Sequence, residues 1–116
     1  MSYKVDSYRF GEVVVNGVKY TSDVIVFWNK VKPNWWRIEG HALHLDDIKE
    51  VFAENPEVIV VGTGAYGIME VKPEVEQYAK SKGIELIKAP TSEACKIYNK
   101  LIHEGKRAVA ALHLTC

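Results

Sequence analysis

The sequence predicts an α/β domain in which helices cover a mixed β-sheet. Its first third contains short valine-rich segments separated by turn residues, which is typical of antiparallel hairpins. From His44 onward, apolar strand-like segments alternate with amphipathic helical segments, which is typical of strands joined by helices. A chain of 116 residues can bury a substantial core, and we expect a single domain over residues 1–116.

The antiparallel part begins with a predicted hairpin. In EVVVNGVKY, residues 12–20, Asn16-Gly17 supplies the positive φ angles that a two-residue turn requires. The segment VIVFW follows as a buried strand. Residues 30–38, KVKPNWWRI, could add another short strand, which Pro33 would confine to the edge of the sheet.

Helices and strands alternate through the rest of the chain. One amphipathic helix is predicted within residues 44–55, and a second begins near Pro73 and ends before Gly83. A third, TSEACKIYNKLIHEG, is capped by Thr91 or Ser92. The intervening strands are EVIVVGTG, IELIKAP and RAVAALHLTC.

Charge and composition exclude several classes of protein. The fifteen basic and fifteen acidic side chains cancel, so we expect no nucleic-acid partner. No apolar segment reaches the roughly 20 residues of a membrane span, so we expect no membrane partner. Two cysteines are too few for a disulfide framework, and a reducing, cytoplasmic location is expected.

The stretch VIVVGTGAYG raises the question of dinucleotide binding. Gly62, Gly64 and Gly67 have the spacing of that motif, but Pro73 delays the next helix, whose N-terminus should meet the pyrophosphate. The following strand has Glu85 near its beginning rather than an acid at its tip, and Lys and Ser/Thr are missing from the P-loop positions. We therefore interpret the glycines as a tight exit from a buried strand, with no cofactor.

A small-anion site remains as an alternative. The GTGAYG and APTSEA segments both follow the carboxyl ends of predicted parallel strands, where ligands of open α/β sheets bind. Backbone amides and a helix N-terminus there could hold an anion, with Arg107 as charge partner. The candidate ligand-binding residues are Gly62, Thr63, Gly64, Tyr66, Thr91, Ser92 and Arg107.

The segment NWWRIEGH suggests a protein-interaction surface. Trp35, Trp36 and Arg37 belong to the residue types enriched at interface hot spots. Alternatively, one tryptophan fills the core and the other covers a sheet edge. Consecutive residues of a strand face opposite ways, so one of the two tryptophans is a candidate for exposure.

Histidine and cysteine offer weaker candidates. The pairs His41/His44 and His113/Cys116 could complete a zinc site, but their spacing has low specificity and we predict no metal. Cys95 lies near the start of the last helix, where the helix dipole lowers a thiol pKa, but small apolar neighbours favour a packing role. We predict no catalytic residue.

Several of these motifs together resemble a known family. RFGEVVVNGVKYTSDVIVF, WW, VIVVGTG and PTSEACKIYNKLIHEGKRAVAALHLTC are similar to a small domain of unknown function that occurs in archaeal and bacterial proteins, a human adipogenesis-associated domain protein and a mitochondrial respiratory complex I assembly factor. The resemblance implies a three-layer α/β fold, no established activity or cofactor, and a role in assembly or regulation. The matching positions are Gly62, Thr63, Gly64, Thr91, Ala94, Tyr98, Asn99, Glu104, Gly105, Arg107 and Val109.

The sequence therefore favours a non-enzymatic, assembly factor-like protein-interaction module with an unidentified protein partner. We expect self-association through the antiparallel edge or the tryptophan segment. The alternative is a binding or catalytic site for a small anionic metabolite at the GTG and PTSEA loops.

Overall fold

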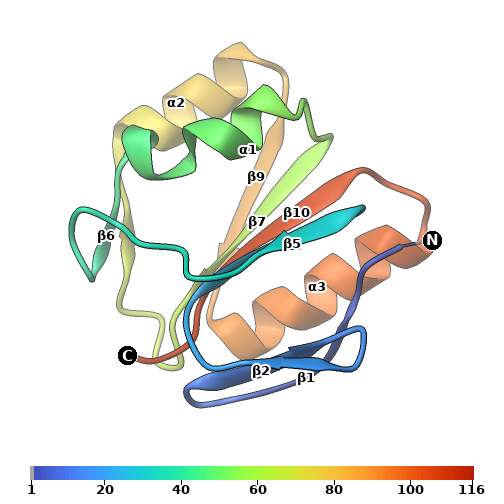
Figure 1. The fold of residues 1–116 in the computed structure, drawn as a ribbon. Helices are drawn as coiled ribbons and strands as arrows, with labels where there is room; N and C mark the ends of the chain where they lie inside the picture. Colours follow the sequence, from blue (N-terminus) through green and yellow to red (C-terminus); the bar gives the residue numbers. More distant parts are fainter. Residues whose placement is uncertain (1) are drawn as a thin grey trace.

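The computed structural model describes residues 2–116 and contains a central mixed sheet of five strands (Figure 1). In spatial order its strands are β5 (Lys30–Lys32), β4 (Val24–Phe27), β10 (Ala108–His113), β7 (Val58–Thr63) and β9 (Glu85–Ala89). Strand β10 runs parallel to β7 and antiparallel to β4, and β7 runs parallel to β9. The predicted mixed sheet is thus confirmed.

Two smaller sheets accompany the central one. The N-terminal sheet is antiparallel and consists of β1 (Val5–Arg9), β2 (Glu12–Val15) and β3 (Val18–Tyr20). The predicted turn between β2 and β3 is confirmed, with φ angles of 47° at Asn16 and 81° at Gly17. A parallel pair joins β6 (Ala42–Leu43) to β8 (Glu70–Val71).

The helices follow the predicted order with one difference. The region predicted as one helix within 44–55 contains a 3₁₀ helix η1 (Leu45–Ile48) followed by a short α1 (Lys49–Ala53). The break occurs because Ile48, with φ −130° and ψ 11°, departs from helical geometry. Helices α2 (Pro73–Ser81) and α3 (Thr91–His103) agree with the prediction.

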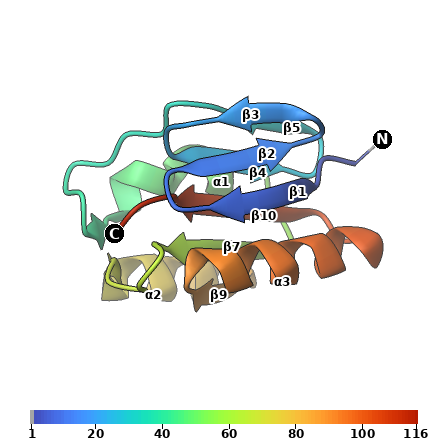
Figure 2. The same cartoon turned by 90° about the horizontal axis from the view of Figure 1, so that it is seen from below.

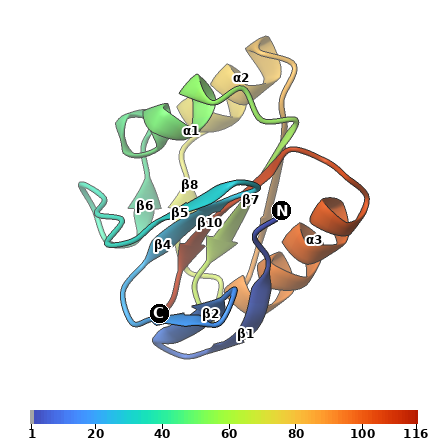
Figure 3. The same cartoon turned by 45° about the vertical axis from the view of Figure 1, so that its right-hand side comes forward.

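The central sheet separates two hydrophobic cores. Alternate residues of β7 point to opposite faces, so Ile59 packs with α1 and α2 whereas Val60 packs with α3 and the N-terminal sheet. Figures 2 and 3 show α3 and the β1–β2 hairpin on the face opposite α1 and α2. The fold therefore has three layers, and its middle strands are apolar on both faces because both faces are covered.

Helix α3 also fastens the beginning of the chain. The buried Tyr98 hydroxyl contacts the carbonyl oxygens of Tyr3 at 2.7 Å and Phe27 at 3.0 Å. The Asn99 amide accepts from the backbone N–H of Val5 at 2.8 Å and donates to its carbonyl at 2.7 Å. These two side chains hold β1 against the helix.

No helix within residues 2–116 is both long enough and apolar enough to cross a membrane.

Candidate functional site

The glycine stretch forms a close junction between strands. A Cβ added at Gly62 would lie 2.9 Å from the Thr91 hydroxyl, and one at Gly64, whose φ is 101°, would lie 2.7 Å from the Thr115 carbonyl. Strand β8 follows the loop, and α2 begins only at Pro73. These glycines therefore serve close backbone packing at the end of β7.

Thr91 ties this junction together. Its hydroxyl accepts the backbone N–H of Gly64 at 2.9 Å and donates to the carbonyl of His113 at 2.5 Å. The prediction that Thr91 or Ser92 caps α3 is wrong: the N-cap is Pro90, and no side chain makes a capping hydrogen bond there. The Thr91 hydroxyl is unavailable to its own helix because it links β7 to β10.

The structure separates the predicted anion-binding residues into three places. Thr63 and Tyr66 line a surface pocket of about 610 Å³ together with Lys88. Ser92 lines a different groove, between α3 and β1. Arg107 precedes β10, at the amino end of the parallel strands, so it lies roughly 20 Å from Thr63 at ~3.3 Å per residue.

Arg107 cannot serve as the predicted charge partner of the two loops. Its guanidinium donates to the Asn55 carbonyl at 2.9 Å and lies 3.8 Å from the Glu57 carboxylate. Thr63 uses its hydroxyl to donate to the Ala89 carbonyl at 3.1 Å. Of the predicted set, Tyr66 keeps an exposed side chain beside the pocket.

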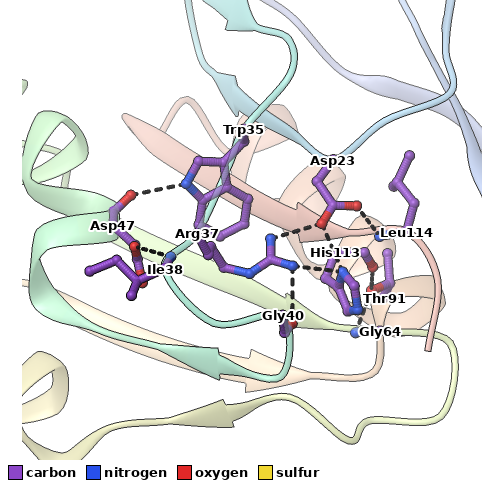
Figure 4. Close-up of polar contacts among 10 residues, drawn as sticks. All are labelled: Asp23, Trp35, Arg37, Ile38, Gly40, Asp47, Gly64, Thr91, His113 and Leu114. Carbon is purple, nitrogen blue, oxygen red and sulfur yellow. Dashed lines mark hydrogen bonds and ion pairs between the residues drawn. The ribbon is translucent and has the colours of Figure 1, made fainter.

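A buried cluster of charged and polar groups lies next to this junction (Figure 4). Arg37 contacts the Asp23 carboxylate at 2.8 Å and His113 Nδ1 at 3.0 Å, and the same Nδ1 lies 2.7 Å from Asp23. The Arg37 side chain is 5% exposed, that of His113 8% and that of Asp23 16%. The cluster joins the turn before β4, the loop after β5 and the end of β10.

Asp23 is the anionic centre of this cluster. Burial opposes its ionisation, but hydrogen bonds from His113, the Leu114 N–H and Arg37 outweigh that effect and lower the Asp23 pKa. Since an arginine nitrogen can only donate and a carboxylate only accept, His113 Nδ1 cannot satisfy both neighbours. The shorter contact to Asp23 assigns the proton to Nδ1.

Two buried nitrogens of the cluster make no hydrogen bond to any described residue. Within residues 2–116, neither Nε2 of His113 nor Nε of Arg37 has a hydrogen-bond partner. Nε2 is fully buried, and a Cβ at Gly64 would lie 3.0 Å from the adjacent ring carbon. Asp23 orients the His113 imidazole, and together with Arg37 the pair links three segments of the chain.

The two tryptophans differ sharply in exposure. Trp35 is 2% exposed, its indole N–H donates to the Asp47 carbonyl at 2.9 Å, and the Arg37 guanidinium lies 4.7 Å from its ring centre. Trp36 is 81% exposed. Of the three residues predicted at an interaction surface, Trp35 and Arg37 have buried side chains, and the prediction stays open for Trp36 alone.

The remaining histidine and cysteine candidates do not converge. The His41 ring stacks edge-on against His113 with centres 6.2 Å apart, whereas His44 pairs with Glu39. Residues 2–116 contain no group of three or more acidic, histidine or cysteine side chains placed to hold a metal ion. Cys95 is buried, which raises its thiol pKa to about 12, so it packs rather than reacts.

Several exposed apolar side chains belong to turns and loops near the ends of β7 and β10. The turn between β1 and β2, the loop after β5 and the loop after β7 all lie at this end (Figure 1). Six large apolar side chains within residues 2–116 are exposed, and all of them except Val18 belong to these segments. We call them the apolar end: Phe10, Trp36, Ile38, Tyr66 and Ile68.

Sequence reasoning found only part of the apolar end. Phe10 and Tyr66 lie with ring centres 6.3 Å apart although 56 positions separate them in the chain. The signal that sequence analysis missed is a large apolar residue placed next to a turn glycine, as Phe10 is to Gly11 and as Tyr66 and Ile68 are to Gly67.

Known proteins share both sequence and fold with this chain. The human NADH dehydrogenase (ubiquinone) 1 alpha subcomplex assembly factor 3 is 28% identical over 111 residues, which cover 93% of this chain and 59% of that protein. The 13 kDa major membrane protein of Francisella tularensis subsp. holarctica (strain LVS) is 27% identical over 101 residues, 85% of this chain and 80% of that protein. The chain thus spans less than two thirds of the human relative.

Solved structures agree with the observed fold. A conserved hypothetical protein from Pyrococcus horikoshii OT3 superposes with a TM-score of 0.86 at 28% identity, covering 97% of this chain and 99% of that one. An outer membrane protein from Bartonella henselae gives 0.85 at 20% identity, covering 99% and 97%, which shows the common fold. A family profile matches residues 5–113. The chain therefore belongs to the family described as protein of unknown function (DUF498/DUF598).

Proposed function

We propose that this protein is an assembly factor-like interaction module that binds a protein partner through its apolar end. The observation that carries the proposal is that five large exposed apolar side chains lie on turns and loops toward one end of the sheet, with the Phe10 and Tyr66 rings side by side. Clustered exposed apolar side chains favour a protein interface, whereas scattered ones are normal. The human relative named as an assembly factor supports the same role.

The geometry suits recognition. Trp36 and Ile38 flank Arg37, whose contacts with Asp23 and the Gly40 carbonyl hold the backbone of the loop in place. An exposed tryptophan on a fixed loop loses little conformational entropy on binding, so it is an effective anchor. The buried polar cluster thus positions the residues that meet the partner.

Site-specific photocrosslinking in the producing cells tests this proposal. A photoreactive phenylalanine analogue at Trp36 should yield one discrete protein adduct, and the same analogue at Val18 should not. Val18 is a matched control because it is 52% exposed and apolar but lies outside the apolar end. Equal adducts from both positions, or none, would contradict the proposal.

Self-association is a defined outcome of the same experiment. An adduct of twice the chain mass, together with a dimer in light scattering that Trp36→Ala converts to a monomer, would identify a second copy as the partner. A strict monomer at all concentrations would remove self-association.

A second candidate function is binding of a small anionic metabolite beside the glycine loop. It is supported by the pocket that contains Tyr66 and Lys88 at the carboxyl ends of β7 and β9. The hydroxyls of Thr63 and Thr91 are already engaged, so Lys88 and the loop backbone would have to hold the anion.

A thermal-shift screen with inorganic phosphate and phosphorylated metabolites tests this second candidate. A ligand at about a hundred times its dissociation constant adds roughly 2.7 kcal/mol of stability. The shift should disappear in Lys88→Gln and persist in Lys80→Gln. A flat screen, or a shift equal in all three proteins, would argue against this site.

A further inference from the structure

A second pocket lies between α1 and α2. Its volume is about 450 Å³, within the range of small-molecule sites. It is formed by the last turn of each helix and the start of η1, on the side of the sheet opposite α3. The pocket shares no residue with the apolar end, although Leu45 and Lys49 also line a neighbouring pocket with Ile38.

The floor of the pocket is aromatic and apolar. Phe52 and Tyr78 meet edge-to-face with ring centres 4.8 Å apart at 85°, and Leu45 and Ala53 complete the lining. Phe52 belongs to the core beneath, and Tyr78 and Leu45 pack against that core. The floor is anchored in this way and offers a fixed surface to a flat or aliphatic group.

Two ammonium groups stand at the rim. Lys82 Nζ lies 5.4 Å from the Tyr78 ring centre, and within the described part of the chain no carboxylate lies within 4.0 Å of it. Lys49 pairs with Asp46 at 2.9 Å in an exposed ion pair. No acidic residue lines the pocket itself, and with Lys49 paired to Asp46 the Lys82 ammonium is the group left to meet an anion.

We propose that this pocket binds an amphipathic monoanion, with an aromatic or short acyl body on the Phe52–Tyr78 floor and one carboxylate or sulfonate at Lys82. A ligand with several negative charges fits poorly, because both helices present C-terminal carbonyl oxygens here, which disfavour each added negative charge. One negative charge can instead be balanced by the Lys82 ammonium, which lies at the edge of the apolar floor.

Fluorescence titration of the full chain with 8-anilinonaphthalene-1-sulfonate tests the proposal, with octanoate as competitor. We expect saturable binding at one site, displacement by octanoate, and weaker binding at high salt. Lys82→Gln should weaken binding roughly fivefold, as loss of about one exposed ion pair implies. Lys82→Arg should retain it, and Lys80→Gln, an exposed lysine of the same helix outside the lining, should leave it unchanged.

A blocking variant separates this pocket from other apolar surfaces. Ala53 is exposed and lines the pocket, so Ala53→Trp should fill it and abolish binding without loss of the folded state, which circular dichroism verifies. Trp36→Ser should leave the titration unchanged. Binding that survives in Ala53→Trp would overturn the assignment, and binding that is lost in Trp36→Ser would overturn it and locate the probe at the apolar end instead.

Discussion

Arg37 shows how much a single side chain contributes to this fold. Its guanidinium is buried between the Asp23 carboxylate and the Trp35 ring. Removing one partner of a buried pair leaves an uncompensated charge, so we expect Arg37→Met to lower the free energy of unfolding by about 3 kcal/mol. Urea denaturation measures the change.

The matched control for Arg37 is an exposed arginine. Arg9 pairs with Glu12 at 3.2 Å but its side chain is 77% exposed. Arg9→Met should therefore change the stability by less than about 0.5 kcal/mol. Equal effects of the two substitutions would show that the buried cluster is not a link in the fold.

His44 makes stability depend on pH near neutrality. The hydrogen bond that His44 donates to the Glu39 carboxylate outweighs desolvation and, with Asp47 and Glu74, raises the His44 pKa above its ordinary 6.5; Asp46 lies in the same turn. Its stabilising contribution is therefore complete below pH 6.5 and is lost as the pH rises through the folded-state pKa.

The expected result is a pH-dependent difference between variants. Between about pH 6 and pH 8.5, the melting temperature of the native protein should fall more than that of His44→Gln. His103→Gln, at the end of α3, serves as control and should follow the native protein. Parallel curves for native protein and His44→Gln would refute the assignment.

At the scale of elements, Thr91 connects one helix to two strands. Replacing it by valine keeps the shape but leaves the Gly64 N–H and the His113 carbonyl without their buried partner. We expect Thr91→Val to cost about 2–4 kcal/mol, because each unsatisfied buried group costs about 1–3 kcal/mol. Chemical denaturation should show this loss, whereas the exposed Ser92→Ala should be near neutral.

The elements that could be predicted are those whose ends are defined by local chemistry. Asn16-Gly17 fixes a turn, and Pro73 and Gly83 bound α2, through their own backbone preferences. The cap of α3 could not be predicted, because Thr91 exchanges a local hydrogen bond for contacts with residues 27 and 22 positions away. Local preference offered Thr91 and Ser92 as caps, and tertiary contacts determined what the Thr91 hydroxyl binds instead.

At the scale of the whole molecule, the buried polar cluster could not be predicted either, because it also depends on tertiary contacts. Asp23, Arg37 and His113 are separated by 14 and 76 positions, and no spacing in the sequence indicates that they meet. The fold brings them together because β4 and β10 are neighbours and the loop after β5 returns to their end. Burial then removes Arg37 from the surface and leaves Trp36 on it.

This division between buried support and exposed contact predicts that stability and partner binding can be separated. Trp36 and Tyr66 are 81% and 72% exposed, so the double variant Trp36→Ser/Tyr66→Ser should keep the free energy of unfolding within about 0.5 kcal/mol of the native value. Trp35→Ala, one position away, should cost about 3–5 kcal/mol because it empties a core position.

Partner binding should be affected by the double variant even though its stability is not. With the photoreactive group placed at Ile38, the double variant should lose the partner adduct although it remains fully folded, because its two largest exposed anchors are gone. Retention of the adduct at native yield would mean that the apolar end does not form the contact. A large loss of stability in the double variant would mean instead that these side chains support the fold and are not free for a partner.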